Sequence, residues 1–317
     1  MAISALAAAA PLAAAGPHDQ GSAVAATPVN GTPPVAVTPV RGTPVPHLPQ
    51  SAVSSTALAQ QMQAAIQAVS PGSQVGIDVV DMSSGTVLVG LNLDQQFYTA
   101  SVVKLLIALD ALNSQGWQPD SDTAAQLREM LSASDDNVAD ALWDANGGDA
   151  IVARMIDAIG LTGTQPPDDP EEWGETLTTA RDVATVYRYL TTVVPEPARD
   201  IVVGALRGTS EISADGTDQY FGIPDGLPGL SWAVKQGWMG LDNSTTLDTT
   251  GLVGPSATQL PYTVVVLTSQ PAGIDWNTGG SALTAGVSVL RGTFDQPLQA
   301  RNLGNEDNRS TAIAPPA

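Results

Sequence analysis

Ser101 and Lys104 lie three residues apart in the stretch Tyr98–Asn113, a spacing that places a hydroxyl and an amine on one face of a helix. Apolar residues fill nearly every other position of this stretch, which is typical of a helix that is buried on all sides. A lysine in such a helix needs a partner or a task as a base, because burying an unpaired ammonium is costly or lowers its pKa. The two side chains can therefore meet, and the amine is a candidate base.

Lysine is used sparingly in this chain. The sequence has ten arginines but only two lysines, Lys104 and Lys235. Arginine stays protonated at physiological pH, whereas a lysine can give up its proton when its surroundings lower its pKa. A sequence that uses arginine for ordinary surface charge and keeps two lysines indicates that a titratable amine is needed at both positions.

The composition excludes several kinds of chemistry. There is no cysteine, and the two histidines, His18 and His47, lie in a proline-rich leader. Thiol nucleophiles, histidine triads and the usual thiolate or imidazole metal sites are therefore absent, which leaves serine with lysine, threonine or carboxylate chemistry. We expect no metal and no cofactor. The net charge of −20 and the pI near 4.1 argue against nucleic acid or an anionic membrane as the main partner.

The ends of the 317-residue chain differ in composition from its centre. Residues 1–16 have the apolar run of a signal peptide without its basic start, so they are interpreted as a signal peptide, a remnant of one, or an alanine-rich tail. Residues 17–50 repeat Thr-Pro and Pro-Val and predict an extended spacer or an ordinary disordered leader. Residues 51–296 are predicted to form the globular domain, and residues 297–317 a disordered tail. No other segment approaches the length of an apolar membrane span.

The order of the expected elements predicts an α+β fold, an α/β sandwich. A five-stranded antiparallel sheet would be flanked by the N- and C-terminal helices, with a reduced helical subdomain inserted between its strands. Residues 161–177 form a loop too long for a plain connection, which hints at a function. The expected helices cover 55–69, 98–113, 121–146, 149–160, 179–193, 197–207 and 279–293, and the expected strands two runs within 73–92 and then 230–237, 245–253 and 262–268.

Three short motifs follow one another in these elements: Ser101-Val-Val-Lys104, Ser134-Asp135-Asp136 and Lys235-Gln236-Gly237. Together they resemble the motifs of the serine β-lactamase and penicillin-binding protein superfamily, specifically its class A-like branch. The resemblance covers residues 53–293. The segments 221–226 and 233–239 are similar to those of exported actinobacterial β-lactamase-like proteins, which include a lipoprotein.

The resemblance implies a role for each residue of the motifs. Ser101 would be the acylated nucleophile, Lys104 the base that takes its proton, and Ser134 the group that relays a proton to the leaving nitrogen. Lys235 would hold a substrate carboxylate. Backbone N–H groups of Ser101 and Trp238 would form the oxyanion hole, with Asp136, Gln236 and Gly237 lining the substrate site. The sequence favours a position for Trp143, Trp173 and Trp238 in the core or in the cleft wall.

Several residues depart from the pattern of that superfamily. Asp136 replaces the usual asparagine, and a carboxylate there would tend to keep Lys104 protonated and make it a poorer base. Gln236 replaces a threonine or serine whose hydroxyl helps to bind a carboxylate. The loop 162–177 has no assignable match for the glutamate that activates the deacylating water in class A enzymes. The nearby acids Glu171, Glu172 and Glu175 cannot be assigned by register.

Two functions are consistent with these observations. The first is an exported, secreted or envelope-associated serine hydrolase that acts by acyl transfer on a cell-envelope peptide, amide or β-lactam, in the manner of a D,D-peptidase and with little β-lactamase turnover. The alternative is a catalytically impaired binding or scaffolding protein of the envelope with the same fold. In either case we expect a monomer whose partner is a small molecule or peptide, with no nucleic acid and no metal.

Overall fold

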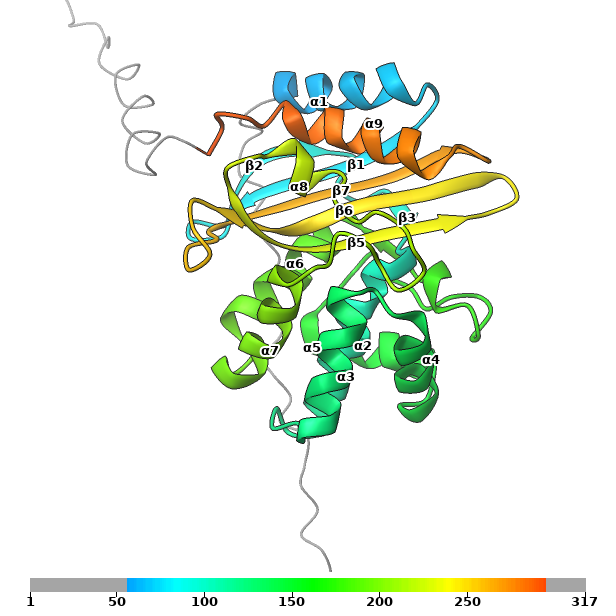
Figure 1. Cartoon of the computed structure of the whole chain (residues 1–317), viewed down its shortest axis with the longest axis vertical. Helices are drawn as coiled ribbons and strands as arrows, with labels where there is room; N and C mark the ends of the chain where they lie inside the picture. The colour runs from blue at the N-terminus through cyan, green and yellow to red at the C-terminus, as the bar shows by residue number, and fades with distance from the viewer. Residues whose placement is uncertain (1–55, 295–317) are drawn as a thin grey trace, which may run out of the picture. The chain divides into compact units, whose positions relative to one another are not determined.

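A five-stranded antiparallel sheet forms the centre of the protein in the computed structural model, which describes residues 56–294 (Figure 1). The strand order is β2-β1-β7-β6-β5, so the first two strands of the chain join the last three. All but the first residue of β1 are buried, because helices cover both faces of the sheet. The strands are β1 (Gln74–Asp81), β2 (Thr86–Leu91), β5 (Ser231–Gly240), β6 (Ser244–Gly254) and β7 (Tyr262–Pro271).

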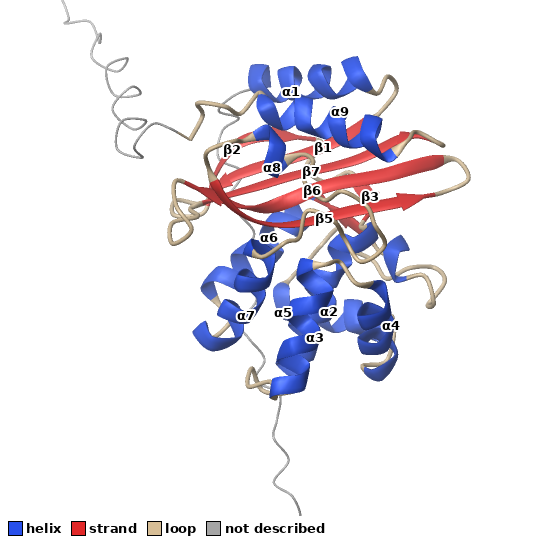
Figure 2. Ribbon diagram, in the orientation of Figure 1, coloured by secondary structure: helices blue, strands red, loops and turns tan. Residues whose placement is uncertain are grey.

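The two terminal helices cover one face of this sheet. Helices α1 (Thr56–Val69) and α9 (Trp276–Ser288) pack against each other and, with the sheet, enclose one cluster of buried apolar side chains (Figure 2). Gly286 of α9 allows this contact, because a methyl group at that position would come 2.5 Å from the side chain of Ile66. The expected helix at 279–293 begins and ends earlier than predicted, since Asp275 caps its N-terminus through the backbone N–H of Thr278.

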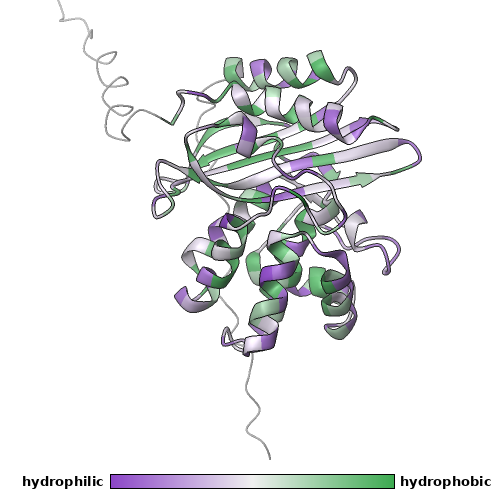
Figure 3. Cartoon of the chain, viewed as in Figure 1, coloured by the Kyte–Doolittle hydropathy of each residue, from purple (hydrophilic) through white to green (hydrophobic). Residues whose placement is uncertain are grey.

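A block of helices covers the opposite face and surrounds the apolar helix α2 (Lys104–Ser114). Figure 3 shows apolar residues on the inward sides of these helices and polar residues on their outer sides. Nine residues of α2 are buried and seven of them are apolar, which explains the nearly continuous apolar run in its sequence. The other helices of the block are α3 (Ser121–Ser132), α4 (Asp136–Ala145), α5 (Ala150–Ile159), α6 (Ala180–Thr192) and α7 (Glu196–Arg207).

Short elements connect the sheet to this block. The structure adds a small two-stranded sheet of β3 (Gln96–Tyr98) and β4 (Leu177–Thr179), which was not predicted because each strand has only three residues. Two 3₁₀ turns, η1 (Ala100–Val103) and η2 (Trp173–Glu175), and the short helix α8 (Ile223–Gly226) complete the fold. The helix expected at 121–146, with an interruption at 132–137, consists of the two helices α3 and α4, because Asp135 caps a new helix through the N–H of Val138.

The predicted fold class is confirmed: a five-stranded antiparallel sheet lies between the terminal helices and an inserted helical block. The predicted signal peptide or remnant (1–16), spacer (17–50) and tail (297–317) lie outside the described residues. Across residues 56–294, none of the helices has the length and apolar character required to cross a membrane.

Candidate active site

Ser101 lies in the 3₁₀ turn η1, directly before α2, rather than in the first α-helical turn as predicted. The residue before it, Ala100, has a φ of +41°, a backbone conformation that residues with a Cβ atom rarely adopt. The neighbouring backbone is fixed from the long loop, because Thr99 donates its N–H to the carbonyl of Thr176 at 2.9 Å and its hydroxyl to Gly174. The fold therefore holds the serine at a strained and well-supported turn.

Lys104 begins α2, and its side chain is fully buried. Its Nζ donates to Ser101 Oγ at 2.9 Å and to the backbone carbonyl of Ser134 at 2.9 Å. It also forms an ion pair with Asp136 Oδ1, whose side chain is 56% exposed. Burial lowers the pKa of Lys104, and the charge and hydrogen bond of Asp136 act against this shift. The amine is thus in contact with the hydroxyl whose proton it would take.

Ser134 joins the two lysines of the chain. Its Oγ accepts a hydrogen bond from Lys235 Nζ at 2.9 Å and lies 3.3 Å from Lys104 Nζ, so its own hydrogen is available to a third group. Ser134 has a φ of +56°, and the capping of α4 by Asp135 fixes the turn that carries it. This hydroxyl can pass a proton between Lys104 and a leaving group.

Lys235 extends from β5, one of the two edge strands of the sheet, and is 1% exposed. Besides Ser134 Oγ, its Nζ donates to the carbonyl of Gln236 at 2.9 Å. Burial lowers the pKa of Lys235 well below its ordinary value, and the charge of Lys104 lowers it further. The strand can approach the serine turn because residue 237 is glycine, where a methyl group would come 2.7 Å from the carbonyl oxygen of Thr99.

Gln236 points away from this cluster. Its buried amide nitrogen donates to the carbonyls of Gln219 at 3.0 Å and Phe221 at 2.6 Å, so it anchors the loop that precedes α8. Of the residues predicted for the site, the structure brings together Ser101, Lys104, Ser134, Asp136 and Lys235. Gly237 and Trp238 lie beside this cluster on β5. The side chain of Gln236 faces the loop instead.

Two tryptophan–aspartate pairs complete the site. The ring of Trp173, in η2, lies 4.8 Å from Lys104 Nζ, and its indole N–H donates to Asp140 at 2.8 Å. The ring of Trp238 lies 5.7 Å from Lys235 Nζ, and its indole N–H donates to Asp215 at 3.0 Å. Trp173 lies in the loop 161–177, and the unusual length of this loop in the sequence indicated a functional role. No spacing in the sequence links Asp140 or Asp215 to the site, so sequence analysis missed them.

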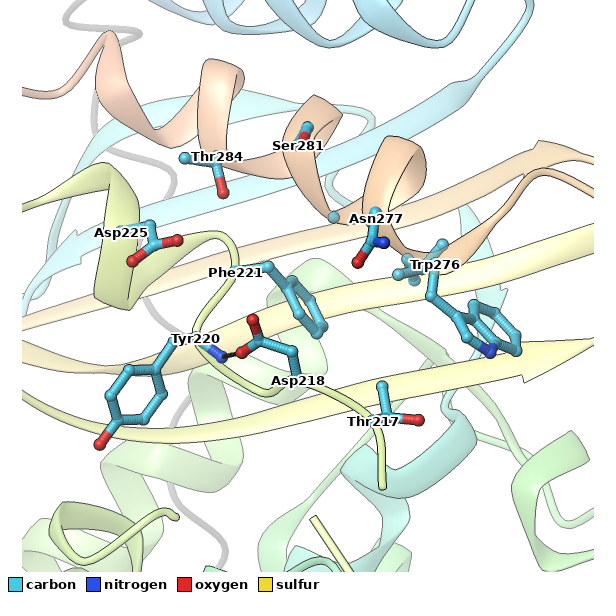
Figure 4. A pocket seen from close by; sticks show the side chains of 11 residues that line it. Thr217, Asp218, Tyr220, Phe221, Asp225, Trp276, Asn277, Ser281 and Thr284 are labelled. Carbon is cyan, nitrogen blue, oxygen red and sulfur yellow. Dashed lines mark hydrogen bonds between the residues drawn. The ribbon is translucent and has the colours of Figure 1, made fainter. Parts of the chain in front are cut away.

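A separate hollow lies at the N-terminal half of α9 (Figure 4). Its lining comes from the segment 217–225, from β6 and from α9, and includes Asp218, Asp225 and Trp276. Burial raises the pKa of Asp225, and the charges of Asp218 and Glu211 raise it further. None of the residues clustered around Ser101 lines this hollow. Among the described residues there is also no group of three or more histidine, cysteine or acidic side chains placed to hold a metal ion.

The fold and the serine–lysine cluster agree with the comparisons to known proteins. The beta-lactamase enzyme family matches residues 57–116 and 121–288, and the chain belongs to this family. The protein named "Putative lipoprotein LppW", from Mycobacterium bovis and Mycobacterium tuberculosis, is 33% identical over 237 residues, which cover 72% of this chain and 73% of the relative. The predicted resemblance is confirmed.

Solved structures support the same fold. PBP-A has a TM-score of 0.62 at 20% identity, with 78% of this chain and 98% of that chain covered. A beta-lactamase from Chitinophaga pinensis has a TM-score of 0.60 at 17% identity, with 74% and 98% covered. A PBP-A variant solved as an acyl-enzyme complex with penicillin G has a TM-score of 0.58 at 20% identity, with 74% and 96% covered.

Proposed function

We propose that this protein is an exported serine hydrolase that acts by acyl transfer through Ser101 on a peptide, amide or β-lactam of the cell envelope. The observation that carries the proposal is the hydrogen bond between Lys104 Nζ and Ser101 Oγ at 2.9 Å, made by a fully buried amine. Burial lowers the pKa of Lys104 toward the range in which a base can work at neutral pH.

In the proposed reaction one proton moves from Ser101 to the leaving group. Lys104 removes the proton of Ser101 as its Oγ bonds to the carbonyl carbon of the substrate. The proton then passes through the hydroxyl of Ser134 to the leaving nitrogen or oxygen as the scissile bond breaks. Backbone N–H groups of Ser101 and Trp238 stabilise the oxyanion. Lys235 fixes Ser134 and adds a positive field.

The relatives support export to the envelope. LppW is named as a lipoprotein, and residues 1–50 of this chain carry the apolar start and Thr-Pro repeats expected of an exported protein with a spacer. A PBP-A variant has been captured as an acyl-enzyme with penicillin G, so a structure with this fold can carry such an adduct.

One observation favours a second candidate, a binding or scaffolding protein without efficient catalysis. The ion pair between Lys104 and Asp136 stabilises the protonated amine, which cannot act as a base. Asp136 is half exposed, however, so solvent weakens this effect. The two candidates differ in whether Ser101 can be acylated.

The test is covalent labelling with a neutral fluorophosphonate, followed by intact-mass spectrometry. We expect a single adduct in the native chain, no adduct in Ser101→Ala, and an unchanged adduct in Ser281→Ala, a matched change at an exposed serine of α9. Absence of labelling in the native chain across pH 6–10 would reject the hydrolase and favour the binding protein.

A further inference from the structure

All three N–H donors of Lys104 and two of the three of Lys235 are already used in hydrogen bonds inside the protein. A lysine ammonium has three donors. Those of Lys104 are taken by Ser101 Oγ, the Ser134 carbonyl and Asp136. Lys235 gives two donors to Ser134 Oγ and the Gln236 carbonyl, and its ammonium lies over the ring of Trp238. A substrate carboxylate would have to displace one of these contacts in order to bind.

The two indole rings are held in place over the lysines. Asp140 accepts the N–H of Trp173, and Asp215 accepts the N–H of Trp238. Asp215 is itself fixed by hydrogen bonds from the hydroxyl of Ser213 and from the backbone N–H of Thr217 at 2.9 Å. The ring of Trp238, which lies over Lys235, is therefore held by the loop that precedes α8. The amide of Gln236 in turn binds this loop to β5.

The charges that face solvent around the two lysines are negative. Asp136 and Asp215 are both exposed and stand next to the lysines. Although partial burial raises the pKa of Asp215, hydrogen bonds from Ser213, Thr217 and Trp238 together hold it below its usual value, so this group stays anionic at neutral pH. A further hollow beside Trp173 is lined by three acids, Asp140, Asp144 and Glu171, and no basic residue lines it. These exposed carboxylates would repel an anionic substrate.

From these contacts and charges we infer that the cleft selects acyl donors whose group next to the two lysines is uncharged, such as an internal peptide bond, an amide or an ester, over donors with a free carboxylate. The inference rests on the proposed acyl transfer by Ser101. It differs from the role that the family resemblance implies for Lys235, because here that ammonium positions Ser134 and supports the ring of Trp238. The bond changes remain those of the proposed reaction.

A matched pair of compounds tests the inference on the intact chain: benzylpenicillin and its methyl ester, which share one strained amide and differ by one charge. The measured quantity is the rate of Ser101 acylation by intact mass, divided by the rate at which hydroxide opens each compound. We expect the ester to acylate about tenfold faster or more, because it lacks the negative charge that Asp136 and Asp215 repel. A benzylpenicillin rate equal to or above that of the ester overturns the inference.

Asp215→Asn tests the source of the preference. The amide oxygen of asparagine can still accept the indole N–H of Trp238, but the amide nitrogen then faces the Thr217 N–H that Asp215 Oδ1 accepted, so the substitution removes the charge, keeps the bond to Trp238 and loses the one from Thr217. We expect the ester-to-acid ratio to fall about threefold in Asp215→Asn and to stay unchanged in Asp157→Asn, a matched change at an exposed aspartate of α5. A ratio that is the same in both variants removes Asp215 as the cause and overturns this assignment.

The two proposals fail in different ways. If the fluorophosphonate labels Ser101 but the methyl ester gives no adduct, the inference about uncharged donors is wrong while the hydrolase remains. If the fluorophosphonate gives no adduct, the hydrolase itself is rejected, and the inference with it.

Discussion

The cleft around Ser101 and the interior of the sheet both bury residues that can carry a charge, but the two regions differ in the hydrogen-bond partners that they provide for these residues. In the cleft, Lys104 and Lys235 have hydrogen-bond partners and an indole ring nearby. In the sheet, Asp78 of β1 has no hydrogen-bond partner for either carboxyl oxygen among the described residues, and Asp248 of β6 has one for a single oxygen, from the N–H of Thr268. Burial raises the pKa of Asp78 to about 8 and that of Asp248 well above its ordinary value.

This difference shows that a shifted pKa does not by itself mark a catalytic group. Burial favours the neutral form of all four side chains. Only the lysines are joined to a hydroxyl that could act as a nucleophile, and only their cluster includes an exposed residue, Asp136, that connects it to solvent. Geometry around Ser101 therefore separates the candidate catalytic amines from the buried acids of the sheet.

The largest expected effect comes from Lys104→Met, which removes the candidate base and keeps the length of the side chain. We expect the rate of fluorophosphonate labelling at Ser101 to fall by about 10³, because general-base catalysis typically contributes 10²–10⁴. The variant should remain folded, since methionine suits the apolar surroundings of α2. The measurement is the labelling rate by intact mass, with circular dichroism as the check on folding.

The sheet offers the control for that experiment. Asp78→Asn should leave the labelling rate within about twofold, since a residue without a contact to the cleft does not alter the transition state. Equal losses of activity in Lys104→Met and Asp78→Asn would show that the rate follows stability rather than chemistry, and the distinction between the two regions would fail.

Much of the fold and the core of the site could be predicted from the sequence. Period-two and period-3.6 patterns gave the five strands and the main helices, and the rarity of lysine marked Lys104 and Lys235. The remaining features depend on long-range contacts. The 3₁₀ turn at Ser101 is held by Thr176, far along the chain, and Asp215 meets Trp238 across 23 residues. Such contacts leave no periodic signal.

Asp78 should make the stability of the protein depend on pH. Its folded-state pKa of about 8 lies above the ordinary value of 3.8, so the neutral carboxyl stabilises the fold at low pH, and this contribution is lost as the pH rises toward 8. The two buried lysines, whose pKa values are lowered, act in the opposite direction, so the effect of Asp78 is measured as a difference between Asp78→Asn and the native chain. The loss between pH 5 and pH 8 is on the order of 4 kcal/mol, from about 1.4 kcal/mol for each pKa unit.

Asp78→Asn cannot ionise and should therefore lose less stability over this interval. We expect its Tm to fall by roughly 10 °C less than that of the native chain between pH 5 and pH 8, measured by calorimetry, since 1 kcal/mol shifts the Tm of a domain of this size by about 2–4 °C. Asp157→Asn is the matched control at an exposed position and should follow the native curve. An Asp78→Asn variant whose Tm falls as much as that of the native chain from pH 5 to pH 8 would contradict a raised pKa for Asp78.

The smallest expected effect, and the sharpest test of how the cleft controls its amine, is Asp136→Asn. Burial lowers the pKa of Lys104, while Asp136 raises it through its charge and hydrogen bond. Asparagine keeps an oxygen that can accept from Nζ but removes the charge, so the pKa of Lys104 should fall further. Labelling depends on the neutral amine and increases with pH as Lys104 loses its proton. The variant should therefore reach half of its maximal rate at a pH about one unit lower than the native chain.

The pH profile of fluorophosphonate labelling from pH 5 to pH 10 measures this shift, with Asp157→Asn as the charge-matched control. A several-fold higher rate at neutral pH, with a similar plateau, would mean that Asp136 restrains an otherwise competent base. A shift to higher pH would mean that the carboxylate itself helps to remove the proton of Ser101. In that case Lys104 would hold Asp136 in place rather than act as the base, and the acid of the cleft, unlike Asp78 and Asp248 of the sheet, would work through a partner.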